Sequence, residues 1–121
     1  MKIIIDPYRG GSDVGTTISG NLEKDIILDI SKKLSNKLKS NGIDTILTRN
    51  GDTSLSDSSR VDIINSLSND NDIIIQNRIN TSEGLNIIYP LSFTDKLESL
   101  ISSNLTKAGF NVGKYYQRRL P

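Results

Sequence analysis

Two short runs of isoleucine constrain the fold of this chain more than any other feature. The first run, Ile3–Ile5, is followed by Asp6 and Pro7. The second run, Ile73–Ile75, comes directly after Asp72. Continuous apolar runs of this length are typical of strands buried on both faces in parallel sheets. Parallel strands need long crossover connections, usually helices. The two runs therefore predict strands of a parallel sheet that are buried on both faces.

The segment after the first run has the spacing of an amphipathic helix. From Leu22 to Leu38, apolar residues recur every three or four positions, and lysines lie on the other side. Glu23 and Asp25 stand in the expected first turn, and Asn41-Gly42 provides a stop signal.

The remaining elements continue this alternation. We expect a strand over residues 43–49, a helix capped by Ser54 or Ser56, a strand over residues 84–89, and a helix capped by Thr94. Strands that alternate with helices predict an α/β fold of three layers, a mostly parallel sheet flanked by helices. The tail from Gly109 to Pro121 shows no closing strand, so we expect the C-terminal strand to be missing.

Chain length and composition limit the classes of function. The 121 residues predict a single domain over residues 1–121, either complete or a fragment of a longer protein. A net charge of +1 offers no global field for nucleic acid. Cysteine and histidine are both absent, which excludes disulfides, thiolate metal sites and the usual general base. No apolar run is long enough for membrane insertion. Because a strand is predicted from residue 2, we expect no signal peptide within these residues, so that either the protein is intracellular or a leader lies outside them.

Candidate site residues follow the ends of the predicted strands. Ligands of open parallel sheets bind beyond the carboxyl ends of the strands. The loops over residues 6–11, 49–52 and 77–83 lie there, and Glu23 lies at the same rim because its helix begins there. We therefore expect Arg9, Glu23 and Arg78 to converge.

At this point the motifs resemble a known family. Several motifs follow one another in a fixed order. They are Ile5-Asp6-Pro7 before Gly10-Gly11, an acidic helix start, Leu47-Thr48-Arg49, Arg60-Val61, and an Asp-apolar strand that leads to Asn80. The set resembles the zinc-dependent N-acetylmuramoyl-L-alanine amidases of bacterial cell-wall and spore-cortex remodelling, from residue 2 to about residue 119. The resemblance implies an amidase/phosphorylase-like fold and an extracytoplasmic setting at the cell wall, cell surface or spore envelope.

The resemblance fails at two of the family's zinc ligands. In the family, two histidines and a helix glutamate hold zinc, in the motifs Asp-Pro-Gly-His-Gly-Gly and Ile-His-Ala-Asn. Here Tyr8-Arg9 stands where the family has Gly-His, Arg78 stands at the second histidine, and Glu23 and Asn80 are kept. The late catalytic glutamate of the family would lie past Pro121.

These departures predict that zinc is lost and that no cofactor is held. Guanidinium has no lone pair to donate and repels a cation. We expect Arg9, Glu23 and Arg78 to form an ion-paired cluster in the former metal site. Nearby residues that could contact a ligand are Asp6, Tyr8, Asn80 and Glu83.

Simpler interpretations of the same residues remain open. Arg9 and Arg78 are each explained as solvated loop residues, and Glu23 as a helix-dipole partner worth about 0.3 to 1 kcal/mol. A hard cation held by Glu23 with acidic neighbours is a further alternative, although the spacing of a calcium loop is absent. Those neighbours are Asp13, Asp25 and Asp29.

The leading hypothesis for function is a catalytically degenerate amidase-like domain. It would act as a non-catalytic peptidoglycan-binding or regulatory module, with peptidoglycan, a stem peptide or a cell-wall protein as its partner. One alternative is an active amidase that hydrolyses the bond between N-acetylmuramic acid and L-alanine. Another is a protein-interaction scaffold.

Overall fold

The computed structural model describes residues 1–79, 85–90, 96–109 and 112–118. The chain divides into two compact units, Met1–Asn80 and Thr81–Pro121. The expectation of a single domain over residues 1–121 stays a prediction.

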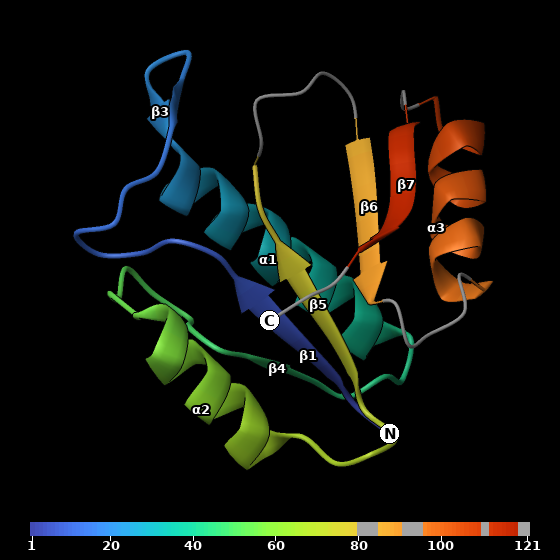
Figure 1. The fold of residues 1–121 in the computed structure, drawn as a ribbon, viewed down its shortest axis with the longest axis horizontal. Coiled ribbons are helices and arrows are strands. Elements are labelled where there is room, and N and C mark those ends of the chain that lie inside the picture. Colours follow the sequence, from blue (N-terminus) through green and yellow to red (C-terminus); the bar gives the residue numbers. More distant parts are fainter. Residues whose placement is uncertain (80–84, 91–95, 110–111, 119–121) are drawn as a thin grey trace. The chain divides into compact units, whose positions relative to one another are not determined.

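A parallel sheet forms the centre of the first unit. Its strand order is β4 (Thr45–Leu47), β1 (Ile3–Pro7), β5 (Ile73–Asn77) (Figure 1). Ile4 lies opposite both Ile46 and Ile74 in the register. Every residue of β1 is buried, as the first isoleucine run predicted. β5 differs, because its residues alternate between half-buried and exposed and Ile74 is 48% exposed.

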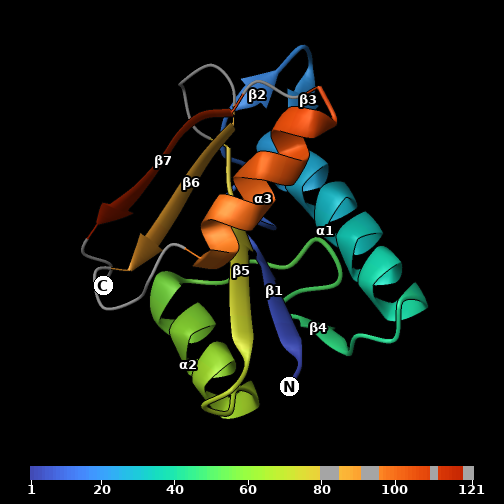
Figure 2. The ribbon, with the colours of Figure 1, turned by 90° about the vertical axis from the view of Figure 1, so that its right-hand side faces the viewer.

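Two helices cover the opposite faces of this sheet, α1 (Glu23–Ser40) and α2 (Asp57–Leu67) (Figures 1 and 2). α1 turns Ile27, Ser31 and Ser35 inward, and the Ser35 and Thr45 hydroxyls form a buried hydrogen bond. Ser56 caps α2 by accepting a hydrogen bond from the backbone N–H of Ser59. The predicted α/β fold, a parallel sheet between helices, is confirmed.

A small hairpin precedes α1 and was not predicted. β2 (Thr17–Ile18) and β3 (Asn21–Leu22) pair antiparallel across Ser19 and Gly20. These two residues have φ of 50° and 81°, as in the type I′ turns that join two-residue hairpins. A serine in this conformation is uncommon, so Ser-Gly alone was a weak signal.

β1 also continues further than its sequence indicated. Asp6 and Pro7 belong to the strand and pair with Gln76 and Asn77 of β5. Tyr8 extends the pairing by donating its backbone N–H to the Asn77 carbonyl oxygen at 3.2 Å. A proline at the last position of a strand removes only one donor, which explains why it does not end the strand earlier.

The second unit contains β6 (Leu85–Pro90), α3 (Lys96–Lys107) and β7 (Val112–Arg118). β6 and β7 are parallel, and α3 contacts both (Figure 2). The expectation that the tail lacks a closing strand is therefore wrong. Its valine and tyrosines favour strands, and the backbone of β6 supplies the ladder that a sequence cannot display. Gly84 and Thr94, at the bounds of predicted elements, lie outside the described residues.

Candidate functional site

The candidate site is built on the loop that follows β1. Arg9, Gly10 and Gly11 have φ of 67°, 133° and 57°. For a non-glycine residue such as Arg9, the left-handed conformation costs about 1 to 2 kcal/mol. Two backbone hydrogen bonds between Gly10 and Asp13, at 2.9 and 3.0 Å, close the turn. The loop is thus held in a shape that its arginine alone would not favour.

Two buried arginines hold the carbonyl oxygens of this loop. Arg49 donates to the Pro7 oxygen at 3.0 Å and to the Tyr8 oxygen at 2.9 Å. Arg60 donates to the Pro7 oxygen at 2.9 Å and to the Arg9 oxygen at 3.2 Å. Burial, together with the charge of Arg60, lowers the pKa of Arg49. Sequence reasoning placed both arginines in family motifs but missed this structural role.

Asp6 is the buried counter-charge of Arg60. Its side chain is fully buried, and Oδ1 lies 2.6 Å from the Arg60 Nη1. Oδ1 also accepts a hydrogen bond from the Thr48 hydroxyl at 2.6 Å, and Oδ2 accepts one from the Gln76 amide at 2.7 Å. Asp6 therefore connects β1 to Arg60 of α2, to Gln76 of β5 and to Thr48 after β4. Its predicted role in ligand binding stays a prediction.

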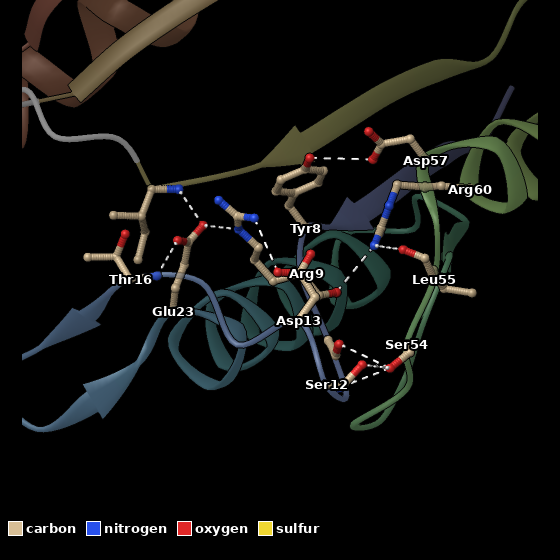
Figure 3. A network of polar contacts seen from close by, with 12 residues as sticks. Tyr8, Arg9, Ser12, Asp13, Thr16, Glu23, Ser54, Leu55, Asp57 and Arg60 are labelled. Atoms are coloured by element: carbon tan, nitrogen blue, oxygen red, sulfur yellow. Dashed lines mark hydrogen bonds and ion pairs between the residues drawn. The ribbon is translucent and has the colours of Figure 1, made fainter.

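Glu23, the first residue of α1, lies at the floor of the site. Its side chain is 1% exposed. Oε1 accepts the backbone N–H of Thr16 at 3.0 Å (Figure 3). Oε2 accepts the backbone N–H of Ile79 at 3.4 Å. Gly15, at φ +71°, passes so closely that an added Cβ would lie 2.5 Å from Oε1. Only glycine fits there, and the carboxylate is fixed by backbone from two separate loops.

Arg9 supplies the positive charge that faces Glu23. Its Nε lies 3.4 Å from the Glu23 Oε2, and its Nη1 lies 3.2 Å from the Asp13 Oδ1 (Figure 3). Desolvation opposes the charged form, but the carboxylates of Glu23 and Asp13 outweigh it and raise the pKa of Arg9. The expected contact between Arg9 and Glu23 is present.

Arg78 takes a different position from the one expected. Its guanidinium carbon lies 4.1 Å from the centroid of the Tyr8 ring, and no ion pair to Glu23 or another described residue is formed. The guanidinium carbons of Arg9 and Arg60 lie 5.0 and 5.2 Å from the same ring. We call these four residues the Tyr8 cluster. The other predicted contact residues, Asn80 and Glu83, lie outside the described residues.

A lysine clamp joins the site loop to the loop after β4, and sequence reasoning missed it. Lys24 Nζ donates to the Gly11 carbonyl oxygen at 2.9 Å and to Asp52 at 2.8 Å. Asp52 also accepts the backbone N–H of Gly11 at 2.8 Å, and the Lys24 hydrogen bond lowers the pKa of Asp52. Nothing in the sequence distinguishes this buried lysine from the solvated lysines of the same helix.

The donor chemistry of the site does not fit zinc. A catalytic zinc needs three protein ligands with lone pairs, usually imidazole, thiolate or carboxylate. The chain has no histidine or cysteine, and the described residues contain no group of three or more acidic side chains that could hold a metal. The acidic neighbours proposed for a hard cation are partly occupied, because Asp13 pairs with Arg9 and Asp29 with Lys33.

Comparison with known proteins identifies relatives of one kind. Residues 3–119 match the family Amidase_3, N-acetylmuramoyl-L-alanine amidase. AmiA of Escherichia coli (strain K12), an N-acetylmuramoyl-L-alanine amidase, is 40% identical over 62 residues, which are 50% of this chain and 22% of AmiA. The chain thus spans about a fifth of the length of that relative.

Two solved structures share the fold over nearly the whole chain. The catalytic domain of the amidase CwlV from Bacillus (Paenibacillus) polymyxa var. colistinus superposes with a TM-score of 0.83 at 25% identity, covering 99% of this chain and 72% of that one. The CwlD amidase of Clostridioides difficile, solved in complex with the GerS lipoprotein, gives 0.80 at 28% identity, with 98% and 72% covered. Since the family match covers almost every residue, the chain belongs to the N-acetylmuramoyl-L-alanine amidase family.

Proposed function

We propose that this domain is a non-catalytic peptidoglycan-binding or regulatory module, derived from a zinc amidase that has lost its metal. The observation that carries the proposal is the contact between the Arg9 Nε and the buried Glu23 carboxylate. An uncompensated buried carboxylate costs about 3 to 5 kcal/mol, which a metal ion or a guanidinium can offset. In this proposal, Arg9 takes over the charge role of the ion without its chemistry.

The family's pattern supports the same interpretation. Arg9 and Arg78 stand at the positions that carry the two histidine ligands in that pattern, and neither can donate a lone pair to a cation. Glu23 would be left as a single ligand. The family supports peptidoglycan as the ligand and an extracytoplasmic location at the cell wall as parts of this proposal. Within the described residues, no helix is long and apolar enough to cross a membrane.

A protein partner is a second candidate, favoured by the CwlD structure, which was solved with the GerS lipoprotein. In this version the domain organises other wall proteins as a scaffold. Sedimentation with purified peptidoglycan separates the two, because a module that binds the wall pellets with it and a pure scaffold stays in the supernatant. The pelleted fraction is measured against the same protein after heat unfolding.

Metal analysis tests the loss of zinc directly. We expect purified protein to carry far less than one zinc per chain and to release no peptide from peptidoglycan. The double variant Arg9→His/Arg78→His should gain zinc, and adding Glu23→Gln should remove it again. Stoichiometric zinc in the unmodified protein, or peptide release that stops with a chelator, would establish the active amidase instead.

A further inference from the structure

Arg78 is the member of the Tyr8 cluster whose charge is not balanced within the described part of the chain. Arg60 is paired with Asp6 at 2.6 Å. Arg9 is paired with Glu23 and Asp13 at 3.4 and 3.2 Å. Arg78 is exposed, and its contact with the described residues is the face of Tyr8. Among the described residues, the cluster therefore holds two guanidinium groups that form ion pairs and one that does not.

The contact with Tyr8 leaves Arg78 able to bind an anion. Its guanidinium carbon lies over the Tyr8 ring, 4.1 Å from the centroid, which is well within the range of a cation–π contact. A cation–π contact with the face of a ring occupies none of the five N–H donors of a guanidinium with a hydrogen bond. The donors of Arg78 are therefore available as far as the described residues are concerned.

The ring that contacts Arg78 is itself fixed. The Tyr8 hydroxyl donates to the Asp57 carboxylate at 3.4 Å (Figure 3). The Tyr8 carbonyl oxygen accepts a hydrogen bond from Arg49 at 2.9 Å. The Tyr8 N–H is bound to the Asn77 carbonyl oxygen of β5, the strand that ends just before Arg78. Both the platform and the arginine are therefore held by the same strand pair.

We propose that Arg78, whose guanidinium lies over the Tyr8 ring, binds the free carboxylate of a peptide ligand through its N–H donors. This inference rests on the proposed function and names the chemical group that the module recognises. A planar carboxylate accepts two parallel hydrogen bonds from a guanidinium, which is the geometry that Lys cannot reproduce.

Local charge favours a carboxylate over a phosphate. The one guanidinium of the cluster that forms no ion pair with a described residue is neutralised by one negative charge. Asp13 and Asp57 flank the cluster and are exposed, so a phosphate, which carries nearly two charges at neutral pH, meets more repulsion there than a monoanion. The site therefore selects a monoanionic group.

The test is an NMR titration of the isotope-labelled chain with N-acetyl-alanyl-alanine, its C-terminal amide and inorganic phosphate. We expect the free acid to shift the Arg78 Nε–H signal and the backbone amides of residues 77–79 in a saturable manner. The amide should cause no saturable shift, and phosphate should bind more weakly than the acid. Equal binding of the amide, or tighter binding of phosphate, would overturn the proposal.

Two variants locate the binding to Arg78. Arg78→Gln should weaken the binding of the free acid by about tenfold or more, which is the loss expected when hydrogen bonds to a charged group are removed. Lys37→Gln removes one exposed positive charge from α1, far along the helix from Glu23, and should leave the affinity unchanged. If Arg78→Gln binds as tightly as the unmodified chain, the carboxylate is held elsewhere and the proposal is wrong.

The outcome is separable from that of the proposed function, since the titration uses a soluble peptide and no cell wall. A chain that pellets with peptidoglycan but ignores the free acid contradicts this inference alone. A chain that binds the free acid through Arg78 but does not pellet with the wall contradicts peptidoglycan binding alone.

Discussion

The buried ion pair between Asp6 and Arg60 allows a direct test of how burial changes the cost of breaking an ion pair, with an exposed ion pair as the matched control. Asp6→Asn keeps the shape of the side chain and the hydrogen bond from Thr48, and the Gln76 amide can turn so that its oxygen accepts. What changes is the charge opposite Arg60, whose side chain is 4% exposed. The control is Asp29→Asn, which breaks a pair with Lys33 in which both side chains are more than 60% exposed, at 63% and 76%.

The two substitutions should differ several-fold in cost. Leaving a buried charge without its partner costs about 3 to 5 kcal/mol. Breaking an exposed i,i+4 pair costs about 0.3 to 0.5 kcal/mol. Since a domain of this size is stable by about 5 to 15 kcal/mol, Asp6→Asn should remove a large share of that free energy of unfolding.

The stabilities of both variants are measured by urea unfolding. The signal is far-ultraviolet circular dichroism, because the chain has no tryptophan to report unfolding by fluorescence. With an m-value of about 2 kcal/mol/M, the midpoint of Asp6→Asn should fall by about 2 M and that of Asp29→Asn by about 0.2 M. Combining Asp6→Asn with Arg60→Met should cost less than the sum of the single changes, because it also removes the stranded cation. Equal midpoint shifts for the two asparagine variants would refute the reasoning.

Two further predictions concern backbone strain and the pH dependence of stability. Gly15→Ala should destabilise the chain by about 2 to 4 kcal/mol, because a side chain at φ +71° is strained and the added Cβ would overlap Glu23. Gly20→Ala should cost only about 1 kcal/mol, because φ is also positive there, at +81°, but no atom lies within 4 Å of the added Cβ; equal unfolding midpoints for the two variants would contradict this. Hydrogen bonds from the Lys2 side chain and backbone lower the pKa of Asp72, so Asp72 stabilises the fold above the ordinary aspartate pKa of about 4 and this contribution is lost as pH falls. Asp72→Asn should therefore be less stable than the unmodified chain at pH 7, and the difference should shrink as pH falls from about 5 toward 2; a difference independent of pH would contradict it.

The predicted elements succeeded where local pattern and tertiary packing agree. β1 and α1 were readable because an isoleucine run and a three-to-four spacing each specify one burial pattern. β7 was missed because a parallel strand depends on a partner more than twenty residues away, and strand-favouring residues alone do not show that such a partner is present. The β2–β3 hairpin was missed because its two strands have only two residues each.

The site was predictable only for residues at the ends of strands and helices. Arg9 and Glu23 come from a strand end and a helix start, so topology brought them to the same rim. Arg78 comes from the same rim, but its guanidinium lies over the Tyr8 ring, a contact that strand order does not predict. The buried role of Arg60 had a signal, because Arg60, Ile64 and Leu67 share one helical face on which a charge requires a partner. Lys24 had none.

The arginine hold on the loop after β1 has a consequence for how such a site changes over time. Arg49 and Arg60 grip the carbonyl oxygens of Pro7, Tyr8 and Arg9, which every amino acid possesses. The backbone conformation of the loop therefore depends little on the identity of its side chains. A loop held in this way can exchange one reactive side chain for another, and lose an activity, while the surrounding fold is unchanged.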